Sequence, residues 1–187
     1  RRVKFVWQSV LFIFRNLRMS YRLCNVPETR IGEVSYRGMR GPDVSQVLHL
    51  YASLHKGRNL SWVRRLLYRI AGRKLMVLAV VKYGVDGRSR VIGMNMYYFN
   101  ARDILENTVH EAFVGVSESM SGRGVATTLR KVAMQHFARN GIYGISSRIS
   151  LDNKASLYSA KKLGYQPVEQ YFDPDTNTER YYLVWRF

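Results

Sequence analysis

Apolar residues recur at strand or helix spacing along most of the chain, and this pattern predicts the order of its elements. The first strand should span residues 33–39, after a connector that contains Pro27, a residue without a backbone N–H donor. Two helices should follow, the first capped by Asp43 and ending at Gly57, and the second capped by Ser61. The apolar faces predicted for these two helices are Val44, Val47, Leu48, Tyr51 and Leu54, and Trp62, Val63, Leu66, Leu67 and Ile70.

The remainder of the chain predicts six further strands and two helices. The strands are expected at 74–83, 90–99, 108–116, 142–151, 166–172 and 179–187, with turns at 84–89 and 173–177 that make two hairpins. The helices are expected at 122–139, with core positions Val125, Leu129, Val132, Ala133 and Phe137, and from a cap on Asp152 or Asn153 through Lys162. The resulting order is βααβββαβαββ, which is an α/β arrangement.

The first 24 residues carry many apolar side chains between scattered arginines. The run from Phe5 to Phe14 is shorter than the roughly 20 residues that cross a bilayer, and no small-residue cleavage site follows it, as a signal peptide would need. Two interpretations remain: a helix lying on an anionic membrane with Trp7 and the phenylalanines inward, or a helix packed on the domain or on a second copy in a homodimer. The predicted organisation is this helix at 1–24, a connector at 25–33 and one domain at 34–187.

Composition limits the class of protein. A chain of 187 residues with 47% hydrophobic and 23% charged residues has the size and the core for one globular domain. Lys and Arg number 30 against 13 Asp and Glu, so the formal net charge is +17, which predicts attraction to anions. The candidate partners are a phosphorylated cofactor, an anionic membrane surface or an acidic acyl carrier protein, with nucleic acid less favoured.

Cysteine and histidine positions argue against two classes of site. The single Cys24 cannot form an internal disulfide and is typical of a reduced thiol in a cytoplasmic protein, with the inner face of the membrane as an alternative location. The four histidines, at 49, 55, 110 and 136, lack metal-ligand spacing, so no metal site is predicted.

A glycine loop joins the predicted strand that ends at Val116 to the helix that follows it. Its residues are Ser121, Gly122, Arg123, Gly124, Val125 and Ala126. Glycine has no Cβ, and the N–H groups of a first helical turn are free, so such a loop can approach and bind a phosphate. A plain turn is the alternative interpretation of the same residues.

Two motifs in this half of the chain resemble those of the GNAT acyltransferases. The loop Ser121-Gly-Arg-Gly-Val-Ala126 is similar to the family's Gln/Arg-x-x-Gly-x-Gly/Ala pyrophosphate loop at Gly124 and Ala126, and departs from it at Ser121. Downstream, Asn153-Lys-Ala-Ser156 and Lys162-Leu-Gly-Tyr165 resemble a second family segment. The resemblance implies a GNAT fold with a mixed, mostly antiparallel sheet of about seven strands flanked by helices, to which the N-terminal apolar helix is an addition.

The resemblance also implies an activity, the transfer of an acetyl group from acetyl-CoA to a primary amine by direct attack on the thioester. The backbone N–H groups of Gly122 to Ala126 and the Arg123 cation are expected to hold the coenzyme A diphosphate. The strand before the loop is expected to pair with the pantetheine arm at Val114 and Val116. Asn153 and Ser156 are expected to contact the cofactor.

His110 is the expected base for the acceptor amine, with Glu111 as the second candidate. In a regular strand, His110, Val114 and Val116 share one face and Glu111 lies on the other. A neutral imidazole suits the abstraction of a proton near pH 7. A strand histidine that is hydrogen-bonded and has no catalytic duty is the alternative.

The general acid is less clearly marked. The position that carries a tyrosine in one form of the family is Ala160 here. Tyr158 lies two residues away, about 200° around a helix, and is the candidate tyrosine although it does not occupy that position. Ser156 or water remains as the other source of a proton for the leaving thiolate.

Two further functions agree with the same residues. One is a longer-chain N-acyltransferase that takes its acyl group from acyl-CoA or an acyl carrier protein at a membrane surface. The other is a non-catalytic module that binds acyl-CoA, nucleic acid or a membrane.

Overall fold

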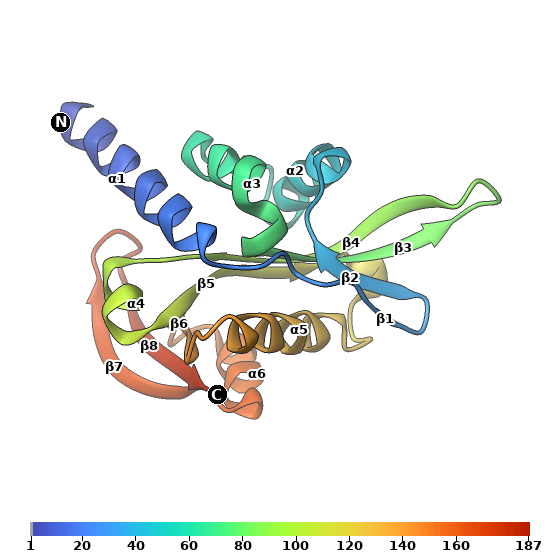
Figure 1. Ribbon diagram of the computed structural model, residues 1–187. Coiled ribbons are helices and arrows are strands. Elements are labelled where there is room, and N and C mark those ends of the chain that lie inside the picture. Colours follow the sequence, from blue (N-terminus) through green and yellow to red (C-terminus); the bar gives the residue numbers. More distant parts are fainter. Residues whose placement is uncertain (1) are drawn as a thin grey trace.

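In the described part of the chain, the strands form a single sheet of eight, and helices cover both of its faces (Figure 1). The computed structural model describes residues 2–187, with side chains from residue 6 onward. The strands are β1 (Thr29–Ile31), β2 (Val34–Gly38), β3 (Met76–Tyr83), β4 (Arg88–Tyr98), β5 (Thr108–Val116), β6 (Gly144–Ser150), β7 (Gln166–Asp173) and β8 (Thr178–Arg186). Their spatial order is β1-β2-β3-β4-β5-β6-β8-β7, and every neighbouring pair is antiparallel except the parallel pair β5 and β6. The predicted α/β fold with a mostly antiparallel sheet is confirmed, with one strand more than expected.

Six helices complete the fold of residues 2–187. They are α1 (Arg2–Tyr21), α2 (Val44–Leu54), α3 (Trp62–Leu75), α4 (Ala101–Glu106), α5 (Val125–Arg139) and α6 (Lys154–Leu163), with short 3-10 turns at Gly41–Asp43 and Glu118–Met120. In Figure 1, α1, α2 and α3 lie above the sheet, and α5 and α6 lie below it. The sequence pattern missed β1 and α4. β1 is three exposed residues inside the predicted connector, and α4 is too short to show a helical period.

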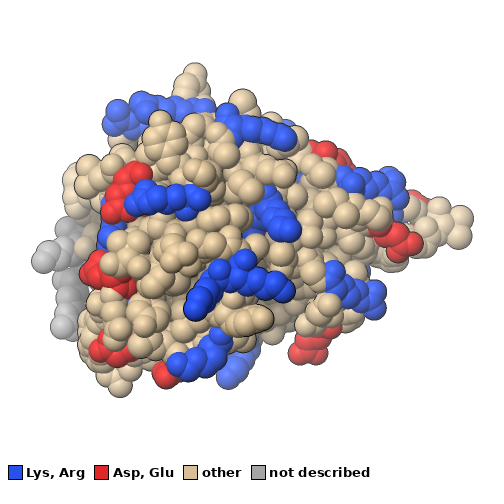
Figure 2. Space-filling model, turned by 90° about the horizontal axis from the view of Figure 1, so that it is seen from below, with Lys and Arg blue, Asp and Glu red and all other residues tan. Residues whose placement is uncertain are grey.

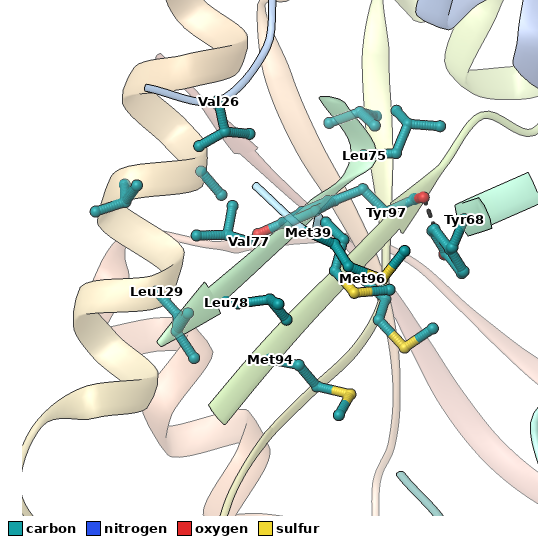
Figure 3. Packing of buried hydrophobic residues seen from close by; sticks show 14 of the residues in the cluster. Val26, Met39, Tyr68, Leu75, Val77, Leu78, Met94, Met96, Tyr97 and Leu129 are labelled. Atoms are coloured by element: carbon teal, nitrogen blue, oxygen red, sulfur yellow. Dashed lines mark hydrogen bonds between the residues drawn. The ribbon is translucent and has the colours of Figure 1, made fainter. Parts of the chain in front are cut away.

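The core forms where β3 and β4 lie between α3 and α5. Residues 76–80 of β3 are all buried, because helices cover both sides of these central strands. Figure 3 shows Met94 and Met96 of β4 packed in this layer, with Leu129 of α5 on one side and Tyr68 on the other. The Tyr68 hydroxyl donates a 3.0 Å hydrogen bond to the carbonyl of Tyr97. All five predicted core positions of α5 are buried, which confirms that prediction.

The predicted apolar face of α3 is wrong in part. Val63 and Leu67 are buried, but Trp62, Leu66 and Ile70 are 53%, 40% and 60% exposed. Two apolar stripes lie next to each other on this helix, and only one can face the sheet. The buried stripe continues through Tyr68, Ala71, Gly72 and Leu75, so the helix also takes the first two residues of the strand expected at 74–83.

Of the predicted caps, Ser61 and Asn153 cap their helices and Asp43 does not. Ser61 accepts a long bond from the Arg64 N–H at 3.5 Å, and Asn153 accepts one from the Ser156 N–H at 3.1 Å. The Asp43 side chain makes no capping bond to α2. Its carboxylate instead accepts two bonds from the buried Arg37 guanidinium, at 2.6 and 3.0 Å, because that buried charge needs a partner.

Helix α1 lies against the domain with one face and leaves the opposite face open. Asn16 is fully buried and bonds both ways to the Phe99 peptide, accepting from its N–H at 2.6 Å and donating to its carbonyl at 3.2 Å. The Phe12 ring packs on Tyr98. Val3 and Phe5, which the pattern also places in this helix, lie outside the described side chains. Among the described helices, none is both long and apolar enough to cross a bilayer.

Candidate active site

β5 and β6 pair for only three residues and then separate. The paired positions are Thr108 with Gly144, Val109 with Ile145 and His110 with Ser146. Beyond them, β5 continues to Val116 bonded only to β4, and β6 continues to Ser150 bonded only to β8. The edge of β5 that faces this opening therefore presents unpaired backbone N–H and C=O groups.

A bulge in β5 changes which side chains share a face of the sheet. Met96 pairs with Phe113 and the next residue, Tyr97, pairs with Glu111, so Ala112 is an extra residue in β5. The expected common face of His110, Val114 and Val116 is therefore wrong. Val116 lies next to Leu129 on the α5 side, and Glu111 reaches α5 as well. His110 lies on the opposite side, where its ring packs on Tyr98.

His110 is buried at the point where the two strands separate. Its Nδ1 lies 2.9 Å from the Ser146 Oγ, and that hydroxyl donates a 2.7 Å bond to the Oδ1 of Asp103. A hydroxyl has one proton, so Ser146 must accept from His110, and the imidazole carries its proton on Nδ1. Thr108 also donates to Asp103, at 2.8 Å, which holds this carboxylate in place. Nε2 of His110 keeps its lone pair and has no hydrogen-bond partner within the described part of the chain.

Burial and three arginines keep His110 neutral. Removal from water is the largest effect, and the charges of Arg148, Arg64 and Arg180 add to it, lowering the pKa of His110 to about 3. At neutral pH the imidazole is therefore uncharged and able to accept a hydrogen bond on Nε2.

Glu111 lies in a buried ion pair instead of an open position. Arg130 of α5 donates to both of its carboxylate oxygens, at 2.7, 3.0 and 3.2 Å, and both side chains are buried. Asn95 donates a further bond to the same carboxylate at 3.2 Å. Burial opposes the charge of Arg130, but Glu111 outweighs it and raises the pKa of the guanidinium. These contacts give Glu111 a structural role, and its proposed catalytic role stays a prediction.

The glycine loop leads directly into the N-terminus of α5. Gly124 is the residue before the helix and has a φ of 76°, and Gly122 has a φ of 74°. A Cβ added at either position would meet nothing within 4 Å, so the space in front of the loop is open. None of the described side chains caps this helix end, and the N–H groups of its first turn remain available to an anion.

The remaining candidates lie on α6. Asn153 caps this helix by accepting a hydrogen bond from the N–H of Ser156, and Ser156 itself is half-buried on the first turn. Tyr158 is 73% exposed on the same helix, whereas Ala160 is fully buried. The phenol of Tyr158 therefore lies in solvent.

Sequence reasoning missed Ser146 and Asp103, which hold His110. Ser146 precedes the recognised Asn153 motif by seven residues, and Asp103 lies in the overlooked α4. Neither belongs to a motif, and their meeting depends on the parallel pairing of β5 and β6. Figure 2, seen from the side of α5 and α6, shows that Lys and Arg outnumber Asp and Glu on this face, as the charge of the chain predicts.

Comparison with known proteins connects this geometry to a family. A search among curated proteins returns no match. Three solved structures share the fold at low identity. The NatC complex bound to Gag peptide and CoA has a chain with a TM-score of 0.68 and 16% identity, covering 83% of this chain and 99% of its own. Arabidopsis thaliana Naa50 with the bisubstrate analogue CoA-Ac-MVNAL has a TM-score of 0.65 and 17% identity, covering 83% and 99%.

The third similar structure is yncA from Salmonella typhimurium with its cofactor acetyl-CoA, which has a TM-score of 0.62 and 19% identity and covers 82% of this chain and 93% of its own. The family model described as Acetyltransferase (GNAT) family matches residues 46–165. This match spans more than half of the chain and includes β5, the glycine loop and α5. The chain therefore belongs to the GNAT acetyltransferase family.

Proposed function

We propose that this chain transfers the acetyl group of acetyl-CoA to a primary amine. The observation that carries the proposal is the separation of β5 and β6 directly beyond His110 and Ser146. It leaves a free strand edge that runs from the histidine to the glycine loop at the start of α5. The solved structures with this fold that contain CoA or acetyl-CoA support the choice of cofactor.

The residues of the opening suit an extended phosphorylated cofactor. The unpaired backbone groups around Val114 and Val116 would bond to the amides of the pantetheine arm. The N–H groups of Gly122 to Ala126 would hold the diphosphate, with Ser121 and Arg123 beside it and Asn153 and Ser156 opposite, on α6. When bound, acetyl-CoA supplies an activated acetyl group as its thioester.

His110 would keep the acceptor amine ready to react. Its Nε2 accepts a hydrogen bond from the amine, directly or through water, while Ser146 and Asp103 fix the ring by its other nitrogen. The amine would attack in its neutral form, and the bond from its nitrogen to the acetyl carbon would form as the carbon–sulfur bond breaks. The nitrogen becomes acidic as it bonds and would then lose its proton to Nε2, and because the pKa of His110 is only about 3, the imidazole would pass this proton on to water. The thiolate takes a proton from water or from Ser156, since Tyr158 is in solvent.

The test is release of free thiol from acetyl-CoA in the presence of a panel of amines. His110→Ala should abolish turnover while acetyl-CoA still raises the melting temperature. Gly124→Glu should abolish both, because a carboxylate replaces the open space in front of α5. His49→Ala, an exposed histidine of α2, serves as the control. Full turnover by both active-site variants would exclude this site.

The length of the acyl group and its carrier are tested separately. Thermal-shift titrations with acetyl-CoA, long-chain acyl-CoA and acyl carrier protein compare the three donors. A larger shift with the longer donors would favour the alternative acyltransferase. Binding without turnover of any amine would favour a non-catalytic acyl-CoA module. Steeply salt-dependent binding of RNA or DNA would favour the nucleic-acid alternative.

A specific observation favours a membrane surface as a second partner. A groove of about 560 Å³ lies between α1 and α4, and its lining combines Leu11, Phe14, Ile104 and Leu105 with Arg15, Arg18 and Arg22. Trp7 and Phe14 on the open face of α1 are 64% and 65% exposed. Neither α1 nor α3 beside it contains an acidic residue. Apolar side chains among arginines suit a surface of anionic lipid, whereas two copies would bring like charges together.

Vesicle sedimentation separates these alternatives. The protein should sediment with vesicles that contain phosphatidylglycerol and not with phosphatidylcholine alone. Trp7→Ser with Phe14→Ser should release it, and Tyr83→Ser, an exposed residue of the distant β3–β4 hairpin, should not. A dimer in solution that the same double variant dissociates would instead support the homodimer.

A further inference from the structure

The side of the sheet on which His110 lies carries arginines that the proposed cofactor does not explain. Arg64 of α3 places its guanidinium carbon 5.2 Å from the centre of the Tyr98 ring. The Tyr98 ring centre in turn lies 5.1 Å from that of His110, its partner in the β4–β5 register. Arg64 is therefore one aromatic ring away from the expected base.

Two more arginines follow along β6 and β8. Arg148 lies two residues after Ser146 on β6, on the same face, at a point where β6 has already separated from β5. Its guanidinium lies 5.9 Å from the centre of the Tyr182 ring, its neighbour on β8. Arg180 is opposite Ser150 in the next position on this face. The charges of all three arginines reach His110, since all three lower its pKa.

The acidic groups nearby do not neutralise this cluster. Asp103 is taken up by hydrogen bonds from Thr108, Ser146 and the Asn100 N–H. Arg180 has Asp173 at 3.3 Å, but its buried Nε donates no hydrogen bond among the described residues. Within residues 2–187, no ion pair involves Arg64 or Arg148. Two unpaired cations thus flank the opening, with a third that is only partly satisfied.

The phosphates of the cofactor are too far away to be the reason. The glycine loop follows Val116, six residues along β5 from His110, which corresponds to about 20 Å in a strand. Arg64 and Arg148 lie at the His110 end of the opening, where the acceptor amine would arrive, whereas Arg180, opposite Ser150, lies further along β6 towards the glycine loop. Like charges around one opening repel, and a bound anion relieves this repulsion.

We propose that the acceptor amine carries an anionic group, a carboxylate or a phosphate, which Arg148 and Arg64 bind while the amine faces Nε2 of His110. This inference rests on the proposed acetyl transfer and names the class of acceptor for it. Arg148 is exposed and aligned with the opening, so it makes the first contact. Arg64, which lies against the Tyr98 ring, contacts the anion from the side of α3. The anion and the amine of one acceptor are thus fixed at two points, which sets the position of the attacking nitrogen.

The experiment compares matched acceptors that differ only in charge. Peptides with an N-terminal Asp or Asn test the carboxylate, and phosphoethanolamine against ethanolamine tests the phosphate, each by thiol release from acetyl-CoA. The anionic member of at least one pair should have a kcat/KM about 10- to 100-fold higher, the range for a charge-assisted hydrogen bond. Arg148→Gln should reduce that preference to about threefold or less, mainly by lowering kcat/KM for the anionic acceptor.

Two further variants complete the test: a matched control at another arginine, and a variant that reverses the charge of Arg148. Arg90→Gln removes an exposed arginine eight residues before Tyr98 on β4 and should leave the preference intact. Arg148→Glu should turn the preference towards a peptide with N-terminal Lys. Equal rates for charged and neutral acceptors in the wild-type protein would overturn the inference and leave acetyl transfer standing. Failure of every amine, with acetyl-CoA still bound, would count against the proposed function itself.

Discussion

The Nδ1 of His110 lies 2.9 Å from the Oγ of Ser146, and these two residues are the last pair that joins β5 to β6. The hydrogen bond therefore sits where the sheet opens. Ser146 donates its own hydrogen bond to Asp103, so it accepts the one from His110 and the ring has one tautomer. The separation of the strands and the orientation of the histidine are consequences of the same local pairing.

Ser146→Ala should lower kcat about tenfold and leave the affinity for acetyl-CoA unchanged. Without the hydroxyl, nothing selects the tautomer that keeps the lone pair on Nε2. A ring in the wrong tautomer or orientation accepts the amine proton less well, and we expect this to cost about tenfold of the rate that general base catalysis contributes. The measurement is kcat with a saturating amine, together with a calorimetric titration of acetyl-CoA. Ser147→Ala removes a buried hydroxyl from the other face of β6 and should have a smaller effect on kcat. Equal losses in both variants would assign Ser146 to stability alone.

The acid stability of the protein should depend on His110. Its pKa is about 3 in the folded chain and near 6.5 when unfolded, so the unfolded state binds more protons between these values. The contribution of the neutral imidazole is complete above pH 6.5 and is lost as the pH falls towards 3. The melting temperature of the wild-type protein should therefore fall more steeply between pH 6.5 and 4.5 than that of His110→Gln. His136, whose pKa burial also lowers, is present in both and cancels. Parallel curves would contradict the assigned burial of His110.

The sequence predicts well wherever one period runs through a whole element. β5 was expected at 108–116 and is found there, and the five core residues of α5 recur at a helical spacing that the structure keeps. Prediction from the sequence fails where a single residue breaks the periodic pattern of side chains. The bulge at Ala112 turns His110 away from Val116, and no side-chain pattern marks it, because the bulge depends on how β4 pairs with β5. The Asp103, Ser146 and His110 chain joins residues that lie up to 43 positions apart, so only the pairing of strands brings them together.

Glu111→Gln should lower the free energy of unfolding by about 3–5 kcal/mol, the usual cost of leaving one member of a buried ion pair alone. Arg130 would keep its charge in the core without the carboxylate that now accepts its bond at 2.7 Å. Denaturant unfolding measures the loss. The double variant Glu111→Leu with Arg130→Met removes both charges and should recover most of the stability. If the double variant is active, Glu111 is not the base. If the double variant folds stably but is inactive, and Glu111→Gln also retains little activity, the Glu111 carboxylate is again a candidate for the catalytic base.

Gly124→Asn should separate cofactor binding from folding. The residue has a φ of 76°, which asparagine tolerates better than other side chains, and it precedes the first turn of α5, where asparagine is a favoured residue. The added Cβ meets no protein atom within 4 Å, so the melting temperature should change little. The side chain nevertheless enters the space in front of the free N–H groups, and the affinity for acetyl-CoA should fall by roughly tenfold or more if a diphosphate binds there.

Gly141→Asn is a matched control, because Gly141 has a φ of 77°, has equally open surroundings and lies just after the opposite end of the same helix. Calorimetric titration of both variants decides the matter, and equal affinities for acetyl-CoA would place the diphosphate away from α5.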